Sequence, residues 1–157
     1  MKKILFSVVL VLFSFSVVNA EQNRLGLKFG NGAEISYQRL LSDANRLEFN
    51  LGLNSFDNNS SFSLSGIYQW TWDLSQLAPG FQWYAGVGGM IGTRTGGVAD
   101  NDNQSDFRAW VIGNIGIEYN FEFPLQLALD WTPAIRVTPN FGAFGADHIR
   151  FAARWRF

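Results

Sequence analysis

The chain has 157 residues, which allows one domain, and it is richer in apolar residues than most soluble proteins. Hydrophobic residues make up 47% and charged residues only 16%, against roughly 25% charged in typical soluble domains. There is no cysteine, which excludes disulfides, thiolate metal sites, cysteine nucleophiles and a lipidated cysteine anchor. The formal net charge of −1 provides no basic field that would attract nucleic acid.

The first 20 residues have the pattern of a secretory signal peptide. Lys2 and Lys3 form a basic start, and the run from Ile4 to Val18 is apolar apart from three serines. This run is too short for an anchor helix, and no basic stop follows it. The sequence therefore predicts a cleaved signal peptide at 1–20 and a single exported domain at 21–157.

The rest of the chain alternates apolar and polar residues with a period of two, which is the pattern of β-strands. Breakers such as Gly30–Gly32 and Pro79–Gly80 separate the alternating segments. We therefore predict an all-β, up-and-down antiparallel meander of eight strands. The segments are Leu25–Phe29, Ala33–Tyr37, Leu47–Leu53, Phe62–Trp70, Trp83–Ile91, Phe107–Tyr119, Leu125–Trp131 and Ile149–Phe157.

Alternation alone does not say whether the apolar set points inward, as in a soluble barrel, or outward, as in a membrane barrel. Charges of both signs occupy the polar set at strand centres, which suits an interior ion-pair network. We expect Asp130 to pair with Arg150 or Arg154, and bulky Tyr84 and Trp110 to help plug the lumen. The predicted network consists of Glu34, Arg46, Glu48, Arg108, Glu118, Asp130, Arg150 and Arg154.

Large aromatic residues of the apolar set gather near strand ends, where amphipathic rings would meet lipid headgroups. The predicted aromatic girdle consists of Tyr37, Trp70, Trp83, Tyr119 and Trp155.

The last strand, Ile149–Phe157, alternates up to a final aromatic residue. It resembles the C-terminal strand of bacterial outer-membrane barrels, and the whole mature chain resembles the small OmpA/OmpX/OmpW-like barrels. The resemblance implies a closed eight-stranded transmembrane barrel in the outer membrane of a Gram-negative-type bacterium, a porin-like fold. It also implies that Phe151, Trp155 and Phe157 form a signal for the barrel-assembly machinery.

An even number of strands places both termini on the same side of the membrane. The resemblance implies that this side is the periplasm. The expected periplasmic turns are Ser42–Asn45, Asp73–Gly80 and Asn120–Pro124. The expected extracellular connections are Gly30–Gly32, Ser55–Ser61, Thr93–Asp106 and Thr138–Asp147, of which the last three are long.

The sequence contains few residues in patterns that are typical of catalytic or metal sites. A lipid A deacylase with this architecture uses a His-x-Ser pair, but the one histidine, His148, is followed by Ile149 and Arg150. Asp100, Asp102 and Asp106 do not complete an EF-hand calcium loop, because the required Gly and Glu positions hold Ser105 and Val111. We therefore expect no catalysis, no cofactor and no protein metal site.

The function predicted is structural, or an interaction at the cell surface through the extracellular loops. The expected partners are outer-membrane lipid, lipopolysaccharide, the assembly machinery and an unidentified loop ligand, with the protein a monomer. Two alternatives remain open at this point, namely OmpW-like transport of small hydrophobic molecules near Trp110 and Met90, and lipid A modification. A third is a soluble secreted barrel with its faces reversed.

Overall fold

The computed structural model describes residues 22–30, 32–56, 59–95, 106–138, 141–142, 144–145 and 149–157. The predicted signal peptide at 1–20 lies outside these residues. Within them, no helix is long and apolar enough to cross a lipid bilayer.

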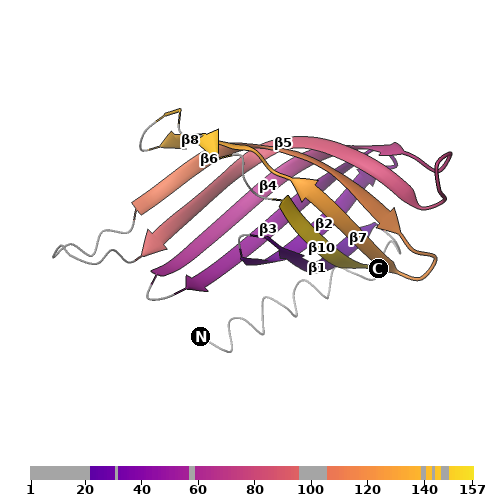
Figure 1. Ribbon diagram of the computed structural model, residues 1–157, viewed down its shortest axis with the longest axis horizontal. Coiled ribbons are helices and arrows are strands. Elements are labelled where there is room, and N and C mark those ends of the chain that lie inside the picture. The colour runs from indigo at the N-terminus through magenta and orange to yellow at the C-terminus, as the bar shows by residue number, and fades with distance from the viewer. Residues whose placement is uncertain are drawn as a thin grey trace.

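The described chain is built of β-strands joined mostly by short connections (Figure 1). The strands are β1 (Asn23–Phe29), β2 (Ala33–Ser42), β3 (Asn45–Phe56), β4 (Asn59–Asp73), β5 (Phe81–Thr95), β6 (Asp106–Asn120), β7 (Leu125–Trp131), β8 (Ala134–Thr138), β9 (Phe144–Gly145) and β10 (Ile149–Arg156).

The sheet closes on itself. Strands β1 to β6 each pair with the next along the chain, and β10 pairs with both β7 and β1. Every one of these pairings is antiparallel. The ring therefore consists of the eight strands β1 to β7 and β10. This confirms the prediction of a closed eight-stranded antiparallel meander. Closure gives the backbone groups of the ring strands hydrogen-bond partners and removes the open edges of a sheet.

The two ends of the barrel differ. Both termini of the ring lie at one end, here called the terminal end, with the connections 43–44, 74–80 and 121–124. The strand ends on either side of the connections β1–β2, β3–β4 and β5–β6 lie at the other, here called the opposite end, which is on the left in Figure 1.

The seventh strand has its predicted bounds, Leu125–Trp131, but the sequence did not predict the further strand that follows it. β7 ends at Trp131, and β8 then continues beside the same neighbour, β6, from Ala134 onward. Pro133, between them, has no backbone N–H to donate, but its carbonyl accepts a hydrogen bond from the Gly113 N–H at 2.9 Å. β8 also pairs with the short β9, so part of the expected loop Thr138–Asp147 is a small hairpin.

The prediction of a long loop at Ser55–Ser61 is wrong. β3 and β4 remain paired from Asn54–Ser61 out to Phe56–Asn59, which leaves only residues 57–58 between the strands. The segment is rich in serine and asparagine, and its polar composition indicated a loop. Backbone hydrogen bonds between strands do not require apolar side chains where the strands extend beyond the apolar band. The polar composition therefore predicted strand ends that are too early for β3 and too late for β4.

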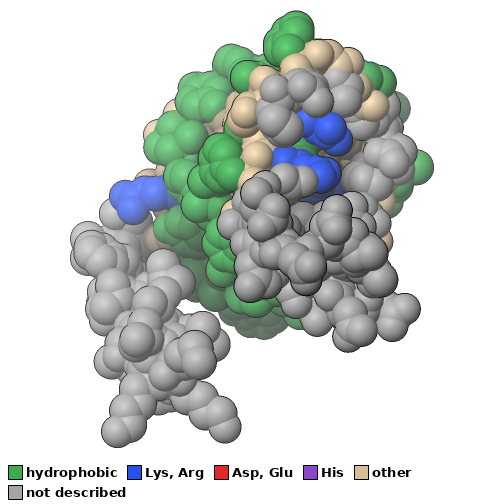
Figure 2. Space-filling view, turned by 90° about the vertical axis from the view of Figure 1, so that its left-hand side faces the viewer, with side chains coloured by type: hydrophobic (Ala, Val, Ile, Leu, Met, Phe, Trp, Pro, Cys, Tyr) green, Lys and Arg blue, Asp and Glu red, His purple; other side chains and the backbone are tan. Residues whose placement is uncertain are grey.

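Burial shows which face is inside. On β3, Arg46, Glu48 and Asn50 are buried, whereas Phe49 between them is exposed. Val87 and Val111, near the middle of their strands, are 56% and 57% exposed. From the opposite end, hydrophobic side chains cover much of the outer wall and basic side chains lie within the mouth (Figure 2). The alternative of a barrel with an apolar interior and a charged exterior is therefore wrong.

Two adjacent glycines of β5 provide a test of how closely the strands pack. A Cβ at Gly88 would collide with the Gly66 carbonyl oxygen and lie 2.8 Å from the Ile67 Cα. A Cβ at Gly89, on the outer face, would have only the Trp110 carbonyl oxygen within reach, at 3.8 Å.

We therefore expect Gly88→Ala to lower the free energy of unfolding in detergent by about 1–3 kcal/mol, because overpacked sites must shift backbone. Gly89→Ala, the matched control, should change it by less than about 0.5 kcal/mol. Urea unfolding followed by tryptophan fluorescence measures both. Equal effects of the two variants would contradict the described packing.

Candidate functional site

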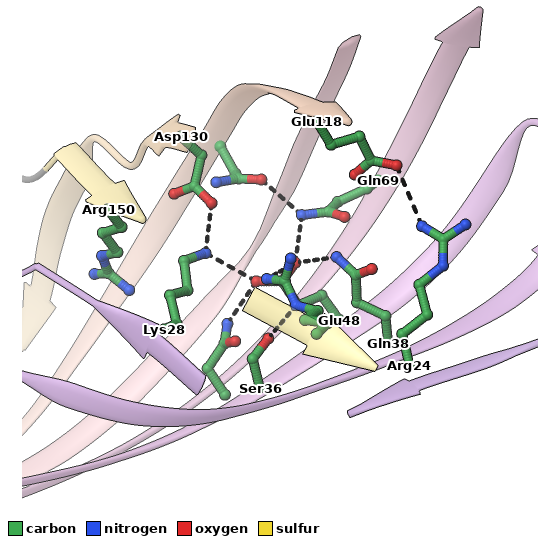
Figure 3. Close-up of polar contacts among 12 residues, drawn as sticks. Arg24, Lys28, Ser36, Gln38, Glu48, Gln69, Glu118, Asp130 and Arg150 are labelled. Carbon is green, nitrogen blue, oxygen red and sulfur yellow. Dashed lines mark hydrogen bonds and ion pairs between the residues drawn. The ribbon is translucent and has the colours of Figure 1, made fainter. Parts of the chain in front are cut away.

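The candidate site is the polar interior of the barrel, and Glu48 of β3 lies at its centre (Figure 3). The Glu48 carboxylate pairs with Lys28 Nζ at 2.9 Å and with Arg154 Nη2 at 3.2 Å. It also accepts hydrogen bonds from three side-chain amides, those of Gln38 at 2.7 Å, Asn50 at 3.0 Å and Gln69 at 3.0 Å. Glu48, Lys28 and Arg154 have no exposed side-chain surface. A buried carboxylate needs this degree of pairing to remain ionised.

Lys28 links Glu48 to a second carboxylate. Its Nζ lies 2.7 Å from Asp130 Oδ2, and Asp130 also accepts hydrogen bonds from Tyr84 at 2.9 Å and Thr132 at 3.1 Å. Two cations, Lys28 and Arg154, therefore face two carboxylates, so this central group is electrically balanced.

The expected pairing of Asp130 with Arg150 or Arg154 is wrong. Asp130 and Arg150 are opposite each other in the β7–β10 register, as their levels on the strands predicted. Arg150 nevertheless pairs with Glu34 of β2 at 3.0 Å, and Arg154 pairs with Glu48. Arginine side chains are long enough to reach past the adjacent strand, so strand level alone does not identify the partner inside a narrow barrel.

A separate group lies toward the terminal end. Glu118 pairs with Arg46 Nη2 at 2.7 Å and with Arg24 Nη1 at 3.2 Å. The Arg46 guanidinium carbon also lies 4.5 Å from the centre of the Tyr84 ring, a cation–π contact. Figure 3 shows Arg24 and Glu118 on one side of the central group and Arg150 on the other.

Seven of the predicted network residues form ion pairs inside the barrel, namely Glu34, Arg46, Glu48, Glu118, Asp130, Arg150 and Arg154. The eighth, Arg108, is half-buried on β6 near the opposite end. The eight residues predicted for the network did not include Arg24 or Lys28. Both lie on the polar face of the first strand, so the alternation itself contained the signal.

Neutral amides complete the interior, and the predicted ion-pair network did not include them. Gln69 Nε2 donates to Asn114 Oδ1 at 2.6 Å, and Arg154 Nη1 donates to Gln126 Oε1 at 3.3 Å. Gln38, Gln69 and Gln126 have no exposed surface. Together with Tyr84 and Ile112 they fill the space between the charged groups.

The predicted girdle residues lie on the outer face at the terminal end. Trp70 and Trp155 are exposed, and Tyr37, Trp83 and Tyr119 are half-buried. Trp83 stacks on Trp72 with ring centres 4.1 Å apart, and Tyr119 contacts Phe81 and Phe121 edge-on or tilted. Tyr37 donates a hydrogen bond to Asn23 at 2.8 Å. Their role at a headgroup layer stays a prediction.

The predicted assembly-signal residues are at the end of β10. Phe151 and Trp155 point outward and are exposed, whereas Phe157 is half-buried. The backbone of Phe157 exchanges two hydrogen bonds with Asn23, so the last strand is paired with the first as far as this residue. Recognition by assembly machinery stays a prediction.

The candidate chemical residues fall largely outside the described part of the chain. This applies to His148, Asp100, Asp102 and Ser105. Among the residues described, no group of three or more His, Asp or Glu side chains could hold a metal ion.

No protein-family model and no curated protein matches this chain. Several solved structures share its fold. The N-terminal β-barrel domain of OprF from Pseudomonas aeruginosa matches 88% of this chain and all of its own at 12% identity, with a TM-score of 0.67. Neisserial surface protein A matches 86% of this chain and 93% of its own at 9% identity, with a TM-score of 0.57. Ail of Yersinia pestis matches the same shares at 8% identity, with a TM-score of 0.55. The chain thus has the fold of the small eight-stranded outer-membrane barrels.

The central carboxylate should be important for stability. We expect Glu48→Gln to lower the free energy of unfolding by about 3–5 kcal/mol, because Arg154 then loses its buried counter-charge and Lys28 retains only Asp130. Glu34→Gln removes a carboxylate of the same chemistry from a pair whose side chains keep 10% and 17% of their surface accessible, so it should cost less, about 1–2 kcal/mol. Urea midpoints of the two variants in detergent measure the difference. A loss for Glu34→Gln as large as that for Glu48→Gln would contradict the central role of Glu48.

Proposed function

We propose that the protein is an integral outer-membrane β-barrel that acts in envelope structure or in surface interaction through its loops, without catalysis. The observation that carries this proposal is the distribution of polarity. Apolar side chains cover the outside of the closed strand ring, while charged and amide side chains lie buried within it.

The apolar exterior favours lipid over water. Leu27, Ile35, Val87 and Val111 are each 48% exposed or more, and they belong to strands distributed around the ring. Soluble monomers rarely expose contiguous apolar patches larger than a few hundred Å². A closed ring with an outward apolar band is the one β architecture that satisfies its backbone in lipid.

The interior supports a structural role rather than conduction. Lys28, Arg46, Glu48 and Arg154 pair across the lumen and leave little side-chain surface accessible. Eight strands enclose a space that side chains can fill. We propose that the barrel is plugged by this network.

The lengths of the connections support one orientation in the membrane. We propose that the terminal end, with its connections 43–44, 74–80 and 121–124, faces the periplasm, and that the opposite end faces outward. Short periplasmic turns and longer extracellular loops are usual in such barrels. Surface contacts would then be made by the connections at the opposite end, among them β5–β6 and the hairpin β8–β9.

Cell fractionation combined with heat-shift electrophoresis tests the proposal. We expect the protein to fractionate with the outer membrane and to migrate differently before and after boiling, because a closed barrel resists unfolding by detergent. A known soluble periplasmic protein and a known outer-membrane barrel from the same cells serve as controls. Recovery in the soluble periplasmic fraction, with no change in mobility on boiling, would refute the proposal.

A further inference from the structure

We propose that a cavity at the terminal end of the barrel binds a small oxyanion, a phosphate or a carboxylate. The cavity lies where β2, β3 and β4 meet the first residues of β1 and β5, and its volume is about 180 Å³. It therefore has room for such an anion. Two arginines line it, Arg24 and Arg46, together with the polar side chains of Ser42, Asn45 and Thr71.

The buried charges around the cavity do not cancel. Arg24 and Arg46 both pair with Glu118, so two guanidinium groups share one carboxylate. The neighbouring carboxylates are already engaged, Glu48 and Asp130 by Lys28 and Arg154, and Glu34 by Arg150. Among the described interior pairs, the surplus positive charge is therefore located beside the cavity. An anion placed there would be favoured by Coulomb attraction in a partly desolvated site.

Arg24 lines the cavity, and one of its buried donors has no protein partner among the described residues. The residue is only 6% exposed, and its Nε is buried without a hydrogen-bond partner among the described residues. Its Nη1 holds Glu118, so the guanidinium is anchored at one edge while Nε is left over. A guanidinium group donates to phosphate and carboxylate oxygens in a fixed, planar geometry.

One carboxylate opposes binding. Asp43 lines the cavity from the turn between β2 and β3, but it is exposed to solvent. Water and salt screen an exposed charge, so Asp43 should weaken anion binding without abolishing it. A variant that removes the Asp43 charge should therefore bind the anion more tightly.

The experiment uses the ¹⁵N-labelled chain purified in zwitterionic detergent micelles. Sodium phosphate replaces sodium chloride at constant ionic strength, and NMR follows the arginine Nε–Hε signals. We expect the Arg24 signal to shift and to saturate. Asp43→Asn should lower the phosphate Kd by about two- to fivefold, as expected for removing one exposed charge.

Two further variants identify the site. Arg24→Gln should abolish the saturable shift at the Arg46 signal, and it leaves Glu118 paired with Arg46, so the barrel should still fold. Arg39→Gln, which removes an exposed arginine of β2 outside the cavity, should leave the phosphate Kd unchanged. Heat-shift electrophoresis verifies that each variant is folded.

A second experiment, which compares inorganic phosphate with lipid nanodiscs, identifies the source of the anion. Saturation by inorganic phosphate supports a free anion as ligand. Saturation only in nanodiscs containing phosphatidylglycerol supports a lipid headgroup phosphate. A shift that stays linear with both probes, or one that is unaffected by Arg24→Gln and Asp43→Asn, would overturn the proposal. The measurement is made on purified protein, so its outcome does not depend on the cellular location tested above.

Discussion

The ion pairs around Glu48 hold the first and last strands of the ring together. An isolated carboxylate in a barrel interior costs several kcal/mol, so Glu48 is stable only where cations and amides surround it. Those groups come from β1, β2, β3, β4 and β10. Lys28 of β1 and Arg154 of β10 belong to the first and last strands of the ring, which meet at its seam. The same contacts that neutralise the carboxylate therefore tie this seam to the neighbouring strands.

A polar interior determines what the exterior must be. Successive residues of a strand point to opposite faces, so charged groups directed inward place the apolar residues of the same strands outward. Phe49, between Glu48 and Asn50, is an example. Such a surface is poorly matched to water and well matched to hydrocarbon. The closed ladder meets the other requirement of a lipid environment, since backbone groups there have no water as an alternative partner.

The period of two predicted the strand number and the residues that share the inward face, because both depend on local alternation. Closure pairs the first strand with the last, and it was implied by the resemblance to small outer-membrane barrels. The partners of the inward-facing residues were less predictable. Lys28 takes the place expected for Arg150 beside Asp130, because the reach of side chains across the lumen decides pairing and the sequence does not display it. The extension of β3 and β4 through Asn54–Ser61 was missed for another reason. Serine and asparagine are common in loops, and the alternation signal disappears where both faces of a strand are polar.

The most direct test of the account is the accessibility of nitroxide labels in lipid bilayers. The chain contains no cysteine, so single cysteines at Val87 and Val111 can be labelled without background. The account predicts high accessibility to oxygen, which dissolves in hydrocarbon, and low accessibility to a water-soluble nickel chelate. A label at Leu77, in the exposed connection between β4 and β5, should show the reverse. Nickel accessibility at Val87 and Val111 equal to that at Leu77 would contradict a lipid-facing exterior.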